Sequence, residues 1–343
     1  MASKKRVTLS DVARLAGLSP TSASMILNGR PDTRLSQAAH DRVHAAAQTL
    51  GYRPNVFARS LRTDKTQTIG FISDLVATTR FASGLIRGAL ESAEAAGHVV
   101  IVLETAGEPD RGTAAIETVL DRQVDGIIFA TMRARELFVP DLPASTPVVM
   151  LNATNSAHPT AVLPDEVNGG RLAVRLLVER GHRDGIALLG QNDDTERDVF
   201  RSATIARRIA GIRSEMSAHG LEFIAEESIW LWEPDTGYAA TRALLERHPE
   251  VRALLCMNDR LAFGAYQALA DAGLSVPEDV SVVSFDNDDL AAYLRPGLTT
   301  IALPHEAMGH HAVQLLLGTQ EAGELLIPMP AVERGSIGAP RSA

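Results

Sequence analysis

Apolar positions along this chain follow two different spacings, and the change between them predicts two kinds of structure. Residues 8–50 hold apolar residues three and four positions apart in short segments, which is typical of amphipathic helices. From residue 68 onward, short continuous apolar runs alternate with helical segments, as in parallel, doubly wound sheets. The pattern therefore predicts a small all-α head and an α/β core long enough for two lobes with a cleft between them.

The alternation also places the segments of the core. The expected strands are Ile69–Ser73, His98–Leu103, Val124–Phe129, Val148–Leu151, Gly185–Leu189, Ala253–Met257 and Val280–Phe285. The expected helices are Leu85–Ala96, Ala114–Arg122, Gly169–Arg180, Arg207–His219, Tyr238–Arg247 and Asp259–Ala272. Ligands of such sheets lie beyond the carboxyl ends of the strands, so polar residues at those ends are candidate ligand groups.

The head carries the signals of capped helices. Thr8 and Asp11 lie three residues apart before an apolar face, which predicts a capping box. Gly17 suits the left-handed position after a helix, and Ser19 with Pro20 suits the start of the next one. A third helix is expected over residues 37–50, with Gly51 ending it. These elements predict a helix-turn-helix sized for the major groove of DNA; the alternative is a generic three-helix bundle.

The apolar residues of these three helices predict which faces point inward. The expected inward residues are Val12, Leu15, Ala16, Ala23, Ile26, Leu27, Val43, Ala46, Ala47 and Leu50. Thr21, Ser22 and Met25 then remain on the outer side of the second helix. Threonine and serine can reach base edges or phosphates, and methionine can contact a thymine methyl group.

Charge is distributed unevenly along the chain. Residues 1–65 hold 11 Lys and Arg against 4 Asp and Glu, a net charge of +7, while the remaining residues hold 22 against 38, a net charge of −16. A basic head on an acidic body concentrates attraction for DNA on the head. The alternative, a solvated basic tail, fits the helix signals less well.

Other features restrict the class of protein. The one cysteine, Cys256, lies in an apolar run and is expected to be a small buried residue, and no metal site or cofactor is expected. The chain shows no signal-peptide pattern and no apolar run near the ~20 residues of a membrane span, so a cytoplasmic location is expected. It also lacks G-x-G-x-x-G, G-x-x-x-x-G-K-[ST], G-x-S-x-G and H-E-x-x-H motifs, which disfavours an enzyme.

The head resembles a known family at the level of its motifs. The patterns T-L-x-D-V-A-x-x-A-G-x-S, S-x-x-L-N-G and L-G-Y-x-P-N-x-x-A-R-S-L, which cover almost all of residues 7–62, are similar to the DNA-binding head of the LacI/GalR repressor family. Two positions depart from the family pattern. Met25 stands where an arginine is common, and Pro20 stands where a larger base-reading side chain can sit.

The resemblance implies a set of DNA-contacting residues. They are Thr8, Ser19, Pro20, Thr21, Ser22, Ser24, Met25, Asn28, Tyr52, Asn55, Ala58, Arg59, Leu61 and Arg62. In the family, the hinge helices of a dimer enter the minor groove together and a leucine wedges into the central base step, which by position is Leu61 here. The alternative is that Leu61 is the core-facing residue of a short amphipathic helix.

The core resembles the same family, as a relative of periplasmic sugar-binding proteins. The landmarks are Asp165–Gly170, Ala206–Gly211, Met257–Asp259, Phe285–Asp286 and Pro296–Ile301. The implied effector-binding residues are Asp74, Arg80, Asn152, Arg208, Trp232, Asn258, Asp286 and His305. Asp74, Arg80 and Asn152 fall at strand ends of the first lobe. The other five have structural alternatives: Arg208 as a solvated helix residue, Asn258 as a helix cap, Asp286 as a turn cap, Trp232 as a packed rim residue and His305 as a hinge filler.

These expectations combine into one hypothesis of organisation and function. Residues 1–53 form the helix-turn-helix domain, 54–66 the hinge helix and linker, and 67–343 the ligand-binding and dimerisation core. The first lobe is expected at about 67–164 and 304–327, the second at about 165–303 and 328–340. The resemblance implies a homodimeric or larger repressor that binds a near-palindromic duplex operator and senses a sugar or related metabolite. A solute-binding protein without a DNA role is the alternative.

Overall fold

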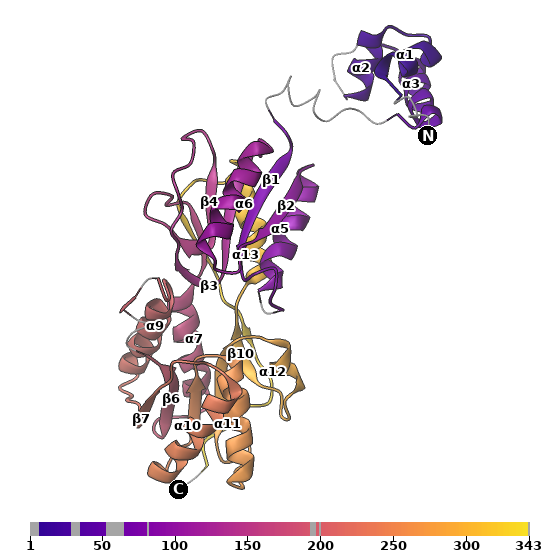
Figure 1. The fold of residues 1–343 in the computed structure, drawn as a ribbon. Helices are drawn as coiled ribbons and strands as arrows, with labels where there is room; N and C mark the ends of the chain where they lie inside the picture. Colours follow the sequence, from indigo (N-terminus) through magenta and orange to yellow (C-terminus); the bar gives the residue numbers. More distant parts are fainter. Residues whose placement is uncertain are drawn as a thin grey trace, which may run out of the picture. The chain divides into compact units, whose positions relative to one another are not determined.

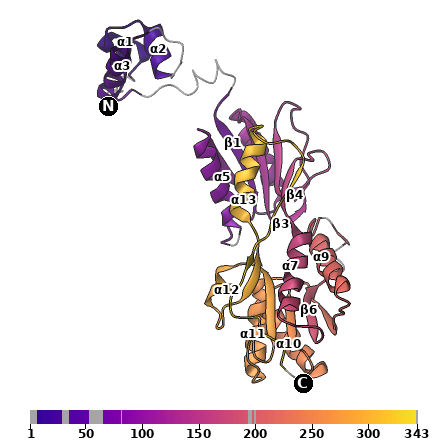
Figure 2. The ribbon, with the colours of Figure 1, turned by 180° about the vertical axis from the view of Figure 1, so that it is seen from behind.

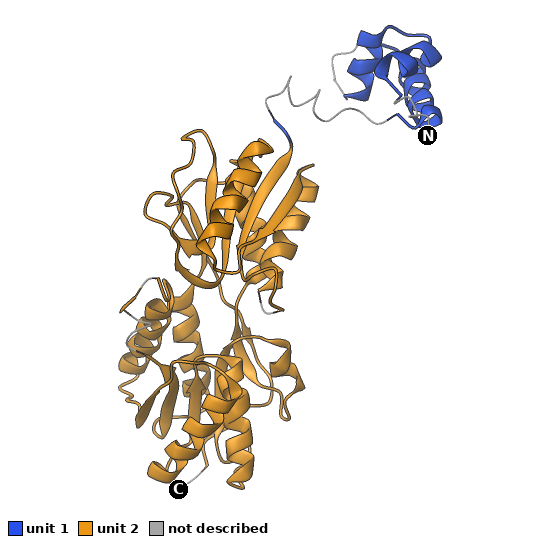
Figure 3. Ribbon diagram, in the orientation of Figure 1, with its two compact units in different colours: residues 1–66 blue, residues 67–343 orange. Residues whose placement is uncertain are grey.

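The chain folds into two compact units, residues 1–66 and 67–343 (Figure 3). The computed structural model describes residues 7–28, 35–52, 65–80, 82–192, 197–198 and 200–341. The described residues of the first unit form the helices α1 (Leu9–Ala16), α2 (Pro20–Leu27) and α3 (Gln37–Leu50). No helix in the described part of the chain is both long enough and apolar enough to cross a bilayer.

The helix ends of the head confirm the predicted caps. Thr8 and Asp11 form a capping box at the start of α1, and the Ser19 side chain accepts a hydrogen bond from the Ser22 N–H at the start of α2. Gly17 and Gly51 follow α1 and α3 with φ angles of 65° and 63°, in the left-handed region that glycine adopts without strain. Short-range sequence signals therefore determine where these helices begin and end.

The interior of the head corrects one predicted inward residue. Val12, Ala13 and Ala16 of α1 are buried against Ala23 and Ile26 of α2 and against α3, whereas Leu15 is 55% exposed. Successive residues of a helix are rotated by about 100°, which turns Leu15 well away from the face that Val12, Ala13 and Ala16 share. The expectation that Leu15 points inward was therefore wrong. Ala13, and not Leu15, faces the interior together with Val12 and Ala16.

The second unit contains two six-stranded sheets, each the centre of one lobe (Figure 1). The first sheet has the order β11-β5-β4-β3-β1-β2 and the second β12-β10-β9-β8-β6-β7. The first-sheet strands are β1 (Thr68–Asp74), β2 (Val99–Glu104), β3 (Gly126–Glu136), β4 (Val148–Thr154), β5 (Ala161–Pro164) and β11 (Glu324–Ile327). The second-sheet strands are β6 (Ile186–Gln191), β7 (Ala225–Ser228), β8 (Ala253–Cys256), β9 (Ser281–Asp286), β10 (Thr299–Ala302) and β12 (Ala331–Val332). The strand pairs are parallel except β10 with β12.

Helices connect and cover these strands. They are α5 (Ser83–Ala95), α6 (Pro109–Asp121), α7 (Glu166–Glu179), α9 (Ile205–Ala218), α10 (Pro234–Arg247), α11 (Asp259–Asp271), α12 (Asp289–Tyr293) and α13 (His305–Leu316). Within the described residues the chain passes between the lobes three times: from β5 to α7, from β10 to α13 and from β11 to β12. Figure 2 shows α13, although late in the sequence, lying beside α5 in the first lobe.

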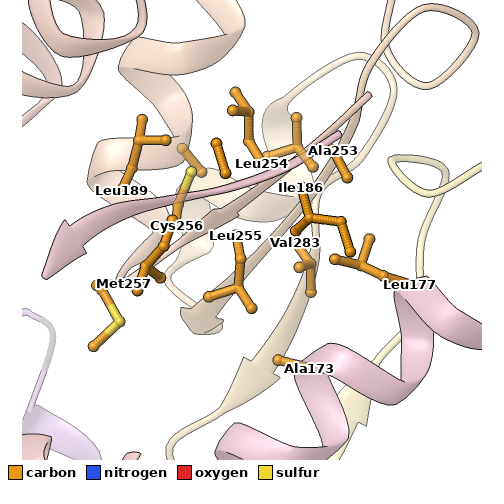
Figure 4. Close-up of a cluster of buried hydrophobic side chains, with 14 of the residues drawn as sticks. Ala173, Leu177, Ile186, Leu189, Ala253, Leu254, Leu255, Cys256, Met257 and Val283 are labelled. Atoms are coloured by element: carbon orange, nitrogen blue, oxygen red, sulfur yellow. The ribbon is translucent and has the colours of Figure 1, made fainter. Parts of the chain in front are cut away.

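Continuous apolar strands form the interior of the second lobe. Figure 4 shows Ile186, Leu255 and Val283 of the strands facing Ala173 and Leu177 of α7. Cys256 is buried within the same cluster, as its apolar run predicted, and burial raises the pKa of its thiol. Strands that are buried on both faces of a sheet consist of unbroken runs of hydrophobic residues. This is why these strands could be predicted from the sequence.

Glycines allow the covering helices to pack closely. The pairs α5–α13, α7–α9 and α10–α11 each place a glycine from both helices at their contact; these are Gly88 with Gly309, Gly170 with Gly211, and Gly237 with Gly264. A Cβ atom added at Gly264 would lie 2.0 Å from the carbonyl oxygen of Pro234. Such a distance is far inside van der Waals contact, so the backbones of these helices touch where a side chain would otherwise separate them.

Candidate DNA-binding and ligand-binding sites

The second helix of the head carries the residues expected to contact DNA. Thr21 is exposed, while Ser22, Ser24 and Met25 are partly buried. Pro20 is the first residue of α2, and Ser19 precedes it as the cap. The positive end of a helix dipole at this N-terminus favours a phosphate group. The arrangement can therefore place a helix start against a DNA backbone.

Several of the predicted contact residues also hold the head together. Thr8 caps α1, and the Asn28 side chain donates to the Ser24 carbonyl oxygen at 2.6 Å. Tyr52 packs partly buried against the interior of the head. These residues have structural roles whether or not they touch DNA. Asn55, Ala58, Arg59, Leu61 and Arg62 lie outside the described residues, so their expected roles stay predictions.

The second lobe gathers its candidate ligand groups around one buried arginine. Arg208 in α9 is 2% exposed, which rules out the solvated alternative. Its Nε and Nη2 atoms donate to the two carboxylate oxygens of Glu166 at 2.6 and 2.8 Å, and its Nη1 donates to the Met257 carbonyl oxygen at 2.7 Å. The guanidinium also lies 4.2 Å from the centre of the Phe285 ring. Arg208 is thus held at the ends of β8 and β9 by partners on three sides.

Asp286 and Asn258 lie beside this arginine at the carboxyl ends of β9 and β8. Asp286 is partly exposed and has a φ of 108°, a strained value for an aspartate that is typical of functional positions. Its carboxyl lies among buried groups, and this desolvation raises its pKa well above the ordinary value, with Arg208 opposing the shift and Asp259 adding to it. Asn258 caps α11, since its Oδ1 accepts from the Leu261 N–H at 2.8 Å.

Trp232 joins the same group through its backbone. Its carbonyl oxygen accepts a hydrogen bond from the Asn258 side chain at 3.3 Å, and its indole N–H lies 3.0 Å from the Gly190 carbonyl oxygen. The ring packs partly buried against the apolar interior of the second lobe. The structure therefore brings Arg208, Trp232, Asn258 and Asp286 together at one edge of the second sheet.

The first-lobe candidates divide between internal and exposed positions. Asp74 at the end of β1 pairs with Arg135 of β3, and the Asn152 side chain donates to the Thr131 and Met132 carbonyl oxygens at 3.0 and 3.1 Å. Both side chains therefore hold the irregular end of β3. Arg80 is exposed and lies 3.5 Å from Asp289 of the second lobe. His305 is buried at the start of α13.

Glu166 is the residue of this site that the sequence interpretation did not single out. Glu166 lies within Asp165–Gly170, one of the landmarks of the family resemblance. Its side chain is 2% exposed, and its carboxylate forms a bidentate ion pair with Arg208. An acidic residue in the first turn of a helix ordinarily interacts with the helix dipole. A glutamate at position 166 therefore gave no indication that it would pair with a buried arginine. The residues that follow it, Val-Asn-Gly-Gly-Arg, form no apolar run, so no signal of this burial was present in the sequence.

Comparison with known proteins agrees with this architecture. Residues 8–55 match the bacterial regulatory proteins of the lacI family, and residues 174–337 match the periplasmic binding protein-like domain. The chain is 31% identical to the ribose operon repressor of Escherichia coli K12, over 96% of this chain and 99% of that protein. It is also 31% identical to the transcriptional repressor PurR of Vibrio atlanticus, over 90% and 91% of the two chains.

Solved structures show the same likeness. The lac repressor dimer bound to operator and the anti-inducer ONPF superposes with a TM-score of 0.74 at 28% identity, covering 98% of this chain and all of that one. The complex of the regulator CelR with cellobiose superposes with a TM-score of 0.61 at 26% identity, covering 96% and 100%. The chain therefore belongs to the lacI family of bacterial regulatory proteins, and it is a DNA-binding transcriptional regulator rather than a plain solute-binding protein.

Proposed function

We propose that this protein is a repressor that binds a near-palindromic operator as a dimer and changes its DNA affinity when a small polyhydroxy ligand binds between its lobes. The observation that carries the proposal is the helix-turn-helix head, whose capped α2 lies inside the segment matched to the lacI family. A core that gathers Arg208, Asn258 and Asp286 at one sheet edge supports the ligand response. The ribose operon repressor and the CelR–cellobiose complex are named for sugars.

Domain roles and location follow the same proposal. Residues 54–66 serve as hinge and linker, and Leu61 wedges into the operator, as the family resemblance implies. The protein acts in the cytoplasm, where its DNA lies, and without catalysing a reaction, since the relatives compared above are repressors. Ligand binding changes the balance between two lobe arrangements that differ in ligand affinity.

Operator binding is expected to require two half-sites and to fall steeply with salt. One recognition helix reads only a few base pairs, so two-fold proteins use paired half-sites, and each phosphate contact releases counterions. Fluorescence anisotropy with a palindromic duplex selected from a random library would measure both effects. A matched duplex with one scrambled half-site is the control. A monomer that binds that control with full affinity would contradict the proposal.

Met25→Arg is expected to shift base preference at one half-site position toward guanine, by about 1–3 kcal/mol. A thioether cannot donate the paired hydrogen bonds by which arginine reads guanine, whereas the variant can. Selection of randomised half-sites with both proteins would reveal the change. Identical preferred sites for the two proteins would show that Met25 does not face the bases.

A further inference from the structure

The ion pair of Arg208 and Glu166 changes what the ligand site can bind. An arginine has five N–H donors in a planar fork that fits a carboxylate or phosphate. Here the Nε and Nη2 side of the fork already holds the Glu166 carboxylate, and Nη1 donates to the Met257 carbonyl oxygen. Three of its five N–H donors are therefore used within the protein, and the two on the Nε and Nη2 side already hold an anion, the Glu166 carboxylate.

Three carboxyl groups lie around this arginine in the part of the chain that the structure describes. Glu166 and Asp259 are buried, and Asp286 is near enough to Arg208 for the two charges to affect one another. Asp259 is held by hydrogen bonds from the Ser284 hydroxyl and the Asp288 N–H, and burial raises its pKa to about 6.

Other arginines described near this edge are engaged elsewhere. Arg207 pairs with Glu324 at 2.7 Å, and Arg260 pairs with Glu233. Arg334 donates to the Leu298 carbonyl oxygen and to the Asn287 side chain, each at 2.7 Å. Among the described residues, the carboxyl groups that interact with Arg208 are those of Glu166, Asp286 and Asp259.

A ligand at Asp286 must supply hydrogen-bond donors without adding negative charge. The carboxylate of Asp286 is an acceptor with no donor among its described side-chain contacts, and it is partly exposed. A sugar hydroxyl can donate to it. A phosphate or carboxylate group would instead compete with Glu166 for the guanidinium of Arg208, and the charge of Glu166 would repel it.

We propose that Glu166 makes this site selective for uncharged polyhydroxy ligands, by occupying Arg208 and thereby excluding the phosphorylated or carboxylated forms of the same sugars. The proposal rests on the proposed function, because it concerns the same ligand site. It assigns to Glu166 a specificity-determining role that acts through Arg208. Glu166→Gln keeps the shape of the side chain but removes its charge. The Nε and Nη2 donors of Arg208 then become available to an anionic ligand.

The test compares the full-length protein with Glu166→Gln and with Glu215→Gln. The control is closely matched, since Glu215 forms a two-pronged pair with Arg175, at 2.7 and 3.1 Å, across the same helices α7 and α9. Calorimetry would use inorganic phosphate and the pairs ribose with ribose 5-phosphate, glucose with glucose 6-phosphate, and glucose with gluconate. We expect the anions to bind Glu166→Gln at least about tenfold more tightly than wild type, and Glu215→Gln to match wild type.

Clear outcomes would overturn the proposal. One is a wild-type protein that binds a phosphorylated or carboxylated probe more tightly than its parent sugar. Another is a Glu166→Gln variant that binds every anion as weakly as wild type while still binding operator DNA, which shows that it is folded. If Glu166→Gln does not fold, Glu166→Asn serves as the second variant with the same expected gain. The half-site and salt dependence of operator binding by the wild type tests the proposed function separately, because that measurement compares DNA duplexes and not ligands.

Discussion

Arg208→Ala is expected to lower the free energy of unfolding of the core by about 3–5 kcal/mol and to abolish the ligand response. The loss arises mainly from Glu166, which would remain buried with no cation to pair with. Both side chains of the pair are at most 3% exposed, so water cannot easily replace the missing partner. Urea denaturation followed by circular dichroism, with and without ligand, measures both effects.

Two further variants separate the causes of that loss. Arg175→Ala removes the arginine of a pair in which Arg175 itself is half exposed, so a cost of about 1 kcal/mol or less is expected. The double variant Arg208→Met with Glu166→Leu should recover most of the stability, because replacing both members of a buried pair by apolar groups is often neutral. An Arg208→Ala protein within about 1 kcal/mol of wild type would show that Glu166 finds another partner.

Gly264→Ala is expected to destabilise the second lobe by about 2–3 kcal/mol or more, although alanine is the better helix former by about 1 kcal/mol. The added Cβ would lie 2.0 Å from the Pro234 carbonyl oxygen and 2.5 Å from the Tyr238 nitrogen. Both are backbone atoms, so the clash can be relieved only by moving α10 away from α11. Thermal and urea unfolding would measure the loss.

Gly112→Ala in α6 is the matched control for this prediction. A Cβ at Gly112 meets no atom within 4 Å, so the variant should gain about 0.5–1 kcal/mol from helix propensity alone. The two variants make the same chemical change in helices and are expected to shift stability in opposite directions. Equal stabilisation by both would show that α10 and α11 separate at little cost.

Much of the fold could be predicted because its signals are local or strongly apolar. Caps at Thr8 and Ser19 and the buried runs of β8 and β9 depend on neighbouring residues, which the sequence displays directly. Strands β5, β7, β10, β11 and β12 were not predicted, since their pairing is decided by distant segments. Helix α13 was missed as well, and its burial depends on contact with α5.

The candidate ligand site could also be predicted in part. Arg208, Asn258 and Asp286 were located by motif, and the structure places them together. The pairing of Arg208 with Glu166 spans 42 positions and leaves no local pattern. Asn152, also expected to bind the effector, donates its side-chain amide to the Thr131 carbonyl oxygen of the neighbouring strand, and its role toward a ligand stays a prediction. Which distant residues pair is decided by how the helices and strands pack. Residue type and spacing along the sequence do not show this packing.

The repeated passage of the chain between the lobes has a consequence for synthesis on the ribosome. The first lobe needs α13 and β11, which are translated only after nearly all of the second lobe. Until then α5 lacks the helix that covers its glycine face, and the β5 edge of the first sheet is unpaired. A nascent chain halted near residue 300 would therefore carry two unfinished sheets with open edges, the form most prone to aggregation and to capture by chaperones.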